Sequence, residues 1–205
     1  MNKAAPDTKG HPKGLGFDEN RDQFVVAEMN RMNNFYGNNP SYTMFCIGNE
    51  LGNSDFGVMK NWVANLKAKD PRRLYAVSTA REITDVDDYS ATHYIKDVGR
   101  TRGLNGAGTN WNFEETYSQM NIPIIAHEIG QWPVYPRWSE IEKYTGVLKA
   151  RNLQGFKVQA EKNGIANQAD DFADASGALN QLMYKYEIES FLRTESCAGI
   201  QLLSM

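Results

Sequence analysis

The sequence predicts an α/β fold in which parallel strands alternate with helices. Short apolar runs alternate with longer amphipathic stretches, a pattern typical of strand–helix units and of a parallel sheet. With 41% hydrophobic and 23% charged residues, the chain has the composition of an ordinary globular protein. Its 205 residues are enough to bury a core. We therefore expect a flexible polar segment over residues 1–16 and one globular domain over residues 17–205.

Five stretches are predicted as strands. Residues 42–47 form a continuous apolar run, as expected of a strand that is covered on both faces. Residues 122–126 form a similar run, and residues 88–94 give the weakest of the five patterns. In chain order, the predicted strands are residues 42–47, 74–78, 88–94, 122–126 and 198–203.

Helices are predicted where apolar residues recur at spacings of three and four. Ser54 precedes one such stretch and is a suitable N-cap, because its hydroxyl can accept a hydrogen bond from a free backbone amide. Residues 96–112 are rich in Gly, Thr and Asn and are predicted to form a long loop without a phosphate-binding pattern. The predicted helices cover residues 22–36, 55–69, 113–120, 138–162 and 168–194.

Charge and composition exclude several classes of partner. The net charge is −3 and no run of Lys or Arg appears, so we expect no nucleic-acid partner. No apolar run is long enough to span a bilayer, so we expect no membrane span. Residues 1–16 lack the apolar stretch of a signal peptide, which leaves the compartment of the parent protein undetermined. The sequence does not predict an oligomeric state.

The cysteines and histidines do not form a metal-binding pattern in the sequence. Neither Cys-x-x-Cys nor His-Glu-x-x-His occurs, so no metal site is predicted. Two cysteines do not make a disulfide framework, and we expect Cys46 and Cys197 to be buried free thiols.

Two glutamates follow apolar strands and are the main candidates for catalysis. Glu50 comes directly after the first predicted strand, and Glu128 comes shortly after the fourth. Sites in parallel α/β folds form at the carboxyl ends of strands. Paired carboxylates at such an edge suit glycoside hydrolysis, where one protonates the leaving oxygen and the other attacks the anomeric carbon. An alternative is that each glutamate simply begins a solvated loop, or that an open sheet holds them far apart around an unrelated ligand.

Several segments resemble one family of glycosidases. Residues 39–41, the apolar run after them and Gly48–Asn49–Glu50 resemble the acid/base strand of glycoside hydrolase family 2, which belongs to clan A. Residues 122–130 resemble the strand of that family that carries the nucleophile. Residues 131–136 and 172–194 resemble a β-galactosidase-like subgroup, so the resemblance covers nearly the whole chain.

The resemblance implies a fold and a reaction. The fold would be an incomplete (β/α)8 TIM barrel with the equivalents of strands four to eight, because a complete barrel takes roughly 250 residues. The reaction would be retaining hydrolysis of β-linked carbohydrate, with Glu50 as acid/base, Glu128 as nucleophile and no cofactor or metal. Because three strands of the family's barrel are missing from this chain, we expect poor solubility, self-association or weak activity of the chain alone. Alternatives are a mannanase-like or cellulase-like enzyme of the same clan and a non-catalytic carbohydrate-binding protein.

The resemblance also suggests substrate-binding residues. Asn49 would hydrogen-bond the sugar hydroxyl next to the anomeric carbon, and His93 or Tyr94 would lie near the nucleophile. Trp132 and Tyr135 could offer aromatic faces to a sugar ring, although packing in the core or a loop is an equal alternative. For His127, alternation along a strand predicts a side chain that points away from Glu128. The predicted substrate-binding residues are therefore Asn49, His93, Tyr94, Trp132 and Tyr135.

Overall fold

The computed structural model describes residues 13–203. The predicted flexible segment lies mostly outside the described residues, and its last part is hydrogen-bonded: Leu15 N donates to Ser54 Oγ at 2.9 Å. The chain divides into two compact units. The larger unit runs to Ile129 and resumes at Ser190, and the smaller unit is Gly130–Glu189. No helix within residues 13–203 is both long and apolar enough to cross a bilayer.

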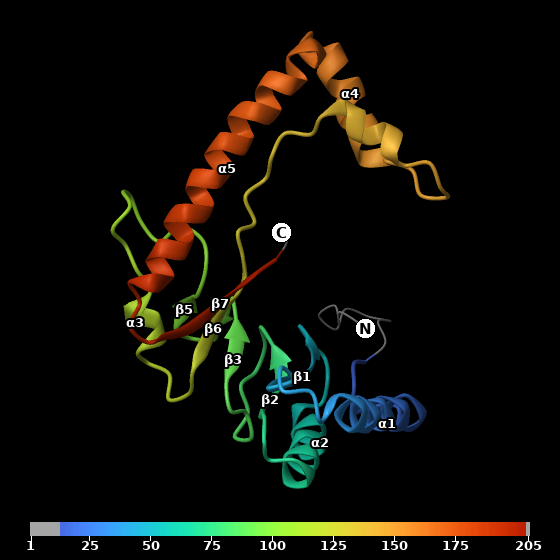
Figure 1. The fold of residues 1–205 in the computed structure, drawn as a ribbon, viewed down its shortest axis with the longest axis vertical. Coiled ribbons are helices and arrows are strands. Elements are labelled where there is room, and N and C mark those ends of the chain that lie inside the picture. Colours follow the sequence, from blue (N-terminus) through green and yellow to red (C-terminus); the bar gives the residue numbers. More distant parts are fainter. Residues whose placement is uncertain (1–12, 204–205) are drawn as a thin grey trace. The chain divides into compact units, whose positions relative to one another are not determined.

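The first two helices of the larger unit, α1 and α2, are shown in Figure 1, and each has an aspartate as its N-cap. Helix α1 covers Glu19–Tyr36, and the Asp18 carboxylate caps it by accepting from the amide of its third residue. Helix α2 covers Phe56–Lys69, and Asp55 Oδ1 accepts from Val58 N at 3.0 Å. The N-cap of α2 is therefore Asp55, and the prediction of Ser54 is wrong, because Ser54 serves the amide of Leu15 instead.

The strands of the larger unit form three small sheets. Strands β1 (Met44–Asn49) and β2 (Leu74–Thr79) are parallel neighbours. A second parallel sheet has the order β3-β6-β7. A two-residue antiparallel pair, β4 and β5, follows β3 in the chain. The remaining bounds are β3 Ser90–Thr92, β4 Tyr94–Ile95, β5 Gly99–Arg100, α3 Glu114–Tyr117, β6 Ile124–Ile129 and β7 Cys197–Leu202.

The expectation of an incomplete (β/α)8 barrel is wrong. The strands of the described residues are short and belong to separate small parallel and antiparallel sheets, whereas a barrel requires one continuous ladder. Two aspartates between β2 and β3 in the chain bind backbone amides of β2. Asp87 Oδ1 accepts from Val77 N at 2.7 Å, and Asp88 Oδ2 accepts from Tyr75 N at 3.0 Å. These carboxylates take up amides of β2 that a neighbouring strand would otherwise use.

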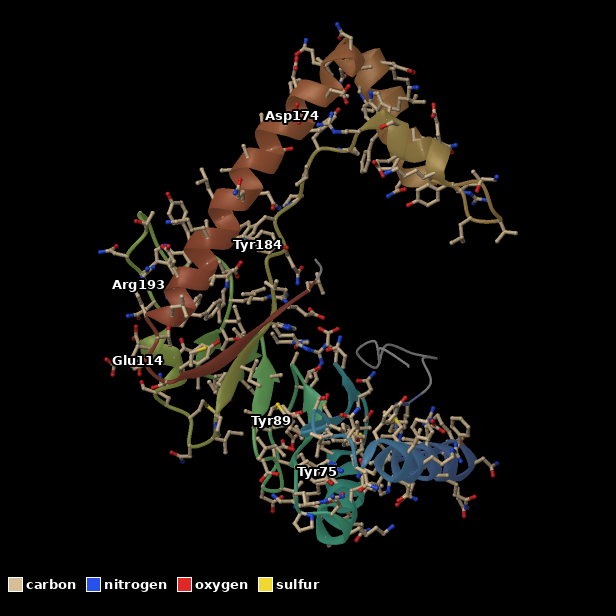
Figure 2. All side chains as sticks on the ribbon, in the orientation of Figure 1. Tyr75, Tyr89, Glu114, Asp174, Tyr184 and Arg193 are labelled. Atoms are coloured by element: carbon tan, nitrogen blue, oxygen red, sulfur yellow. The ribbon has the colours of Figure 1, made fainter. Side chains whose placement is uncertain are left out.

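Apolar side chains of α1, α2, β1 and β2 form the main core of the larger unit. Met59 and Val63 of α2 are fully buried, as are Tyr75 and Val77 of β2. Tyr89 lies in an adjacent buried cluster (Figure 2), where its hydroxyl donates to the backbone oxygen of Phe45 at 3.1 Å. This core fixes β1 and β2 rigidly and thereby the residues that follow them. Its buried members are Met29, Phe45, Ile47, Leu51, Met59, Val63, Leu66, Tyr75 and Val77.

A second group of aromatic rings packs together in the same unit. The rings of Phe113 and Phe191 are stacked with centroids 5.0 Å apart, and Tyr117 lies against both. Thr194 Oγ1 accepts from Phe113 N at 3.0 Å. These contacts anchor the chain directly before β7, so that the last strand can pair with β6.

The smaller unit is largely helical. It contains the 3-10 helix η1 (Trp138–Lys143), α4 (Arg151–Lys162), η2 (Ala166–Gln168) and most of α5 (Ala169–Leu192). The single helix predicted over residues 138–162 is therefore interrupted, whereas the predicted helix over residues 168–194 is confirmed. Gly130 has φ +79°, and a Cβ there would lie 2.2 Å from the Tyr184 ring, so this position requires glycine.

Candidate active site

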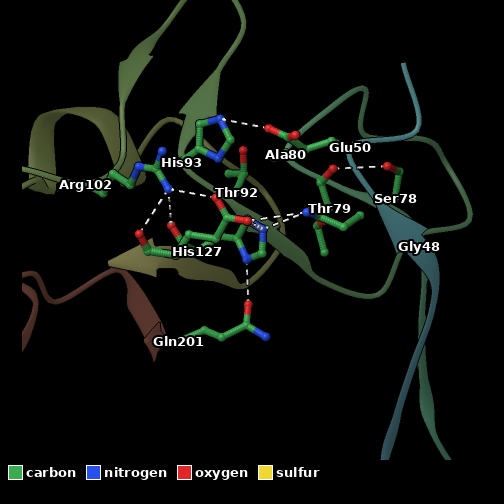
Figure 3. A network of polar contacts seen from close by, with 12 residues as sticks. Gly48, Glu50, Ser78, Thr79, Ala80, Thr92, His93, Arg102, His127 and Gln201 are labelled. Carbon is green, nitrogen blue, oxygen red and sulfur yellow. Dashed lines mark hydrogen bonds and ion pairs between the residues drawn. The ribbon is translucent and has the colours of Figure 1, made fainter. Parts of the chain in front are cut away.

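Polar side chains gather at the carboxyl ends of parallel strands in the larger unit (Figure 3). Asn49 ends β1 and Glu50 follows it, and Thr79 ends β2. His127 and Glu128 lie near the end of β6. All the residues of Figure 3 belong to one unit, so their relative positions are set by the same core.

Both candidate glutamates have an unusual backbone conformation. Glu50 has φ +51° and Glu128 has φ +55°, which places both in the left-handed region. Residues other than glycine rarely adopt this region, and it costs of order 1–3 kcal/mol per residue. Ala80, which follows β2, shares the feature with φ +53°. Such strained residues cluster at functional sites, where the surrounding structure holds a side chain in a required direction.

A β-bulge in β6 turns His127 and Glu128 toward the same place. In the pairing of β6 with β7, Ala126 is opposite Ile200 and Ile129 is opposite Leu202, with a register shift between them. Two residues of β6 therefore face one residue of β7, as in a bulge. His127 Nε2 lies 3.5 Å from Glu128 Oε1. The expectation that His127 points away from Glu128 is wrong, because strict alternation holds only for regular strands.

Hydrogen-bond donors surround the Glu128 carboxylate. Arg102 Nη1 lies 3.1 Å from Oε2, and Asn49 Nδ2 lies 3.3 Å from Oε1. Burial raises the pKa of Glu128, but the hydrogen bond from Arg102, the charge of His127 and the hydrogen bond from Asn49 outweigh it and lower the pKa below its usual value. Glu128 is therefore held in its ionised form at neutral pH, as a nucleophilic carboxylate requires.

Glu50 lies among basic side chains of its own. Its Oε1 is 3.5 Å from Arg81 Nη2 and 3.8 Å from His93 Nε2. An oxygen of Glu128 and a ring nitrogen of His93 also lie within 4.8 Å of each other. The two carboxylates are thus neighbours of one imidazole, His93.

His93 itself is held between the two carboxylates. Its ring stacks on that of His127, with centroids 6.0 Å apart and an interplanar angle of 14°. Burial is the main cause that lowers the pKa of His93, and the charge of Arg102 lowers it further. His93 is therefore neutral at pH 7. A neutral ring has one N–H and one lone pair. It can therefore donate a hydrogen bond to a carboxylate and leave the negative charge of that carboxylate in place.

Three of these side chains lie close enough together to suggest a cation site. One potential ligand atom from each of His93, His127 and Glu128 lies within 4.8 Å of the others. However, the guanidinium of Arg102 contacts Glu128, and both ring nitrogens of His127 are engaged with the side-chain amides of Gln201 and Asn49. A metal ion would have to displace these contacts. It would also be repelled by the positive charge of the Arg102 guanidinium. The residues do not fit a metal ion.

The other residues predicted to bind substrate occupy different surroundings. Tyr94 is half exposed in β4, where its backbone hydrogen-bonds the Thr92 hydroxyl. Trp132 and Tyr135 belong to the smaller unit. Trp132 Nε1 donates to buried Glu187 at 2.9 Å, and the Tyr135 ring packs edge-on against its neighbours Trp138 and Phe172. These contacts favour the packing alternative, and sugar binding by the three residues stays a prediction.

Four residues of the site were not predicted from the sequence: Thr79, Arg81, Arg102 and Gln201. Thr79 and Arg81 come just after the predicted strand of residues 74–78, and a position after a strand is the same signal that identified Glu50. Arg102 lies within the predicted loop of residues 96–112, which gives no positional signal. Gln201 is a polar residue inside the last apolar run, and that mismatch is the signal that could have identified it.

The arrangement offers an ionised carboxylate, a second carboxylate nearby, a neutral imidazole and two guanidinium groups. No family model matches the chain, and no curated protein matches it. The chemistry is therefore inferred from the geometry of the site together with the local resemblance of its strands. Paired carboxylates with fixed donors are suited to acid–base and nucleophilic chemistry at a polarised C–O bond.

Proposed function

We propose that the chain hydrolyses O-glycosidic bonds of a β-linked carbohydrate by a retaining double displacement at Glu50 and Glu128. The observation that carries the proposal is the convergence of both carboxylates on His93, at 3.8 Å for Glu50 and within 4.8 Å for Glu128. The resemblance to glycoside hydrolase family 2 supports the same pair of residues. This support comes from the local resemblance of the two strands that carry the glutamates. It does not depend on a barrel, because the strands of the described residues form separate small sheets.

In the first step, Glu128 attacks the anomeric carbon and forms an ester bond to the sugar. The bond from that carbon to the leaving oxygen breaks, and Glu50 gives its proton to the departing alcohol. In the second step, Glu50 accepts a proton from water while the water oxygen attacks the anomeric carbon. The ester bond breaks, Glu128 returns to its ionised form, and the configuration at the anomeric carbon is retained.

The contacts of the Glu128 carboxylate support its proposed role. Glu128 accepts from Arg102 and Asn49, so its charge is held and its orientation is fixed before substrate arrives. The side chain of Glu50 is 15% exposed, which leaves it partly shielded from water. The left-handed backbone at both positions is a further reason to assign them function, because strain of this kind persists only where the fold enforces it.

Release of nitrophenol from a panel of 4-nitrophenyl β-glycosides tests the proposal. We expect turnover of at least one β-glycoside. Glu50→Gln should lower kcat by about 10²–10⁴-fold, the range typical of lost acid–base catalysis, and Glu128→Gln, which removes the nucleophile, should lower it at least as much. Glu115→Gln, an exposed glutamate of α3, is the matched control and should leave the rate unchanged. Turnover that survives Glu128→Gln would refute the mechanism. Sugar binding without turnover would instead support a non-catalytic carbohydrate-binding protein.

A further inference from the structure

A chain of polar contacts connects strand β7 to Glu128 through β6 and β1. Gln201 Oε1 contacts His127 Nδ1 (Figure 3). On the other side of the ring, His127 Nε2 lies 3.0 Å from Asn49 Oδ1. Asn49 Nδ2 then reaches Glu128 Oε1 at 3.3 Å. His127 is buried, so these contacts are made away from bulk water.

The contacts of the Asn49 side chain fix the orientation of its amide. An ionised carboxylate only accepts hydrogen bonds, so the group that faces Glu128 must be the NH₂ of Asn49. The amide oxygen then lies at the other end, where it accepts from the Thr79 hydroxyl. Turning the amide over would place its oxygen against the Glu128 carboxylate and leave two acceptors facing each other.

The orientation of this amide determines where His127 carries its proton. The oxygen of Asn49 can only accept, and it faces His127 Nε2. Nε2 must therefore carry a hydrogen, because a lone pair there would meet the lone pairs of the amide oxygen. The Gln201 amide can face Nδ1 with its NH₂ when the ring is neutral, or with its oxygen when the ring is charged. Gln201 thus accommodates both forms of Nδ1 while Nε2 keeps its hydrogen.

We propose that His127 is a positioning residue, whose Nε2–H fixes the Asn49 amide so that Asn49 holds the Glu128 carboxylate in place. His127 acts through Asn49 and needs no contact with substrate. The backbone bulge makes this possible, since it brings consecutive residues of β6 to the same side of the sheet. The catalytic consequence rests on the proposed function, whereas the position of the hydrogen on His127 does not.

Nuclear magnetic resonance of the full chain labelled with ¹⁵N-histidine tests the position of the hydrogen. The chain has three histidines, so a His127→Gln variant assigns the signals by loss of one pair. In mildly alkaline buffer, where free imidazole is neutral, long-range ¹H–¹⁵N spectra distinguish a nitrogen that carries hydrogen from one with a lone pair. We expect the Nε2–H tautomer for His127. An Nδ1–H tautomer would overturn the proposal.

Two variants test the link between His127 and Asn49. Asn49→Ala removes the acceptor at Nε2, and we expect the two ring-nitrogen shifts of His127 to move toward each other as the tautomers mix. Thr79→Val is the matched control, because Thr79 donates to the same Asn49 oxygen without touching the ring. We expect it to preserve the Nε2–H tautomer. Ring shifts that are unchanged in Asn49→Ala would show that Asn49 does not hold the tautomer, and would overturn the proposal.

Kinetics with the 4-nitrophenyl β-glycoside that the unaltered chain turns over test the catalytic consequence. His127→Leu should lower kcat by about tenfold, the effect of one lost hydrogen bond, with little change in KM. The acid limb of the pH profile should move to higher pH, because the charge of His127 and the bond from Asn49 that His127 positions both favour ionised Glu128. His127→Gln, which keeps an N–H donor, should recover most of the rate. An Nε2–H tautomer without turnover of any glycoside would refute the proposed function and leave the hydrogen-bond assignment intact. An unshifted acid limb in an active His127→Leu variant would refute the positioning role.

Discussion

Asn49 Nδ2 lies 3.3 Å from Glu128 Oε1, although 79 residues of chain separate them. One residue ends β1 and the other lies in the bulge of β6, two strands that belong to different sheets. The contact shows that the carboxyl ends of the two sheets meet at one place. It also connects the residue directly before Glu50 to Glu128.

Replacing Arg102 by Met should move the acid limb of the kcat/KM profile to higher pH. Arg102 lowers the pKa of Glu128, and the proposed mechanism requires the ionised carboxylate. Removing the guanidinium raises that pKa, so activity is lost at a higher pH during acidification. Arg100→Met, an exposed arginine of β5, is the control. An acid limb that is the same in both variants would show that Arg102 does not hold the charge of Glu128.

Cys46 should react slowly with thiol reagents in the folded chain. Burial raises its pKa to about 11, so very little thiolate is present at pH 8. Burial also raises the pKa of Cys197, and both cysteines are free thiols. The two residues are only partly buried, which corrects the expectation of buried thiols. A colorimetric disulfide reagent should therefore label neither rapidly in native buffer and both in denaturant. Rapid labelling of Cys46 in the native chain would contradict the burial of this thiol.

Replacing Asp55 by Ala should lower the free energy of unfolding by about 1 kcal/mol. Asp55 Oδ1 accepts from Val58 N, so the substitution leaves a first-turn amide of α2 without its cap. Asp55→Asn keeps the acceptor and is the matched control, with a much smaller expected loss. Urea denaturation followed by circular dichroism measures both. Equal stability of Asp55→Ala and the unaltered chain would contradict the assignment of Asp55 as the N-cap.

Replacing Met59 by Ala should cost about 2–5 kcal/mol of stability, the range for large-to-small changes in a core. Met59 is fully buried against β1 and β2, where the shortened side chain leaves a cavity. Met32→Ala, at an exposed position of α1, should change stability by no more than about 0.5 kcal/mol. Comparable losses in the two variants would mean that Met59 does not lie in the core.

Much of the secondary structure could be predicted from the sequence, because local apolar patterns determine it. The predicted strand over residues 42–47 and the predicted helix over residues 168–194 correspond to β1 and α5. The expectation of a barrel is wrong, since the number of strands does not determine which strands pair. The carboxylates of Asp87 and Asp88 bind backbone amides of β2 through side-chain bonds, which no periodicity reveals.

The position of the two candidate glutamates at strand ends could be predicted, but most of their contacts could not. Glu50 and Glu128 follow apolar runs, which is a local signal. The direction of His127 depends on a bulge that exists only in the pairing with β7, and Gln201 reaches the ring across that pairing. Arg102 comes from a loop without periodicity. Contacts of this kind depend on tertiary structure and leave little trace in one sequence.

The identity of the residue that bonds covalently to the sugar is the most direct test of the proposed reaction. A 2-deoxy-2-fluoro β-glycoside with a good leaving group, matched to the sugar that the chain hydrolyses, slows the second step and traps the glycosyl-enzyme. Mass spectrometry of proteolytic peptides then locates the added mass. We predict one sugar on Glu128, with no label in Glu128→Gln. A chain that hydrolyses the parent glycoside but carries the label on another residue, or forms no adduct and releases the sugar with inverted configuration, would contradict the central claim.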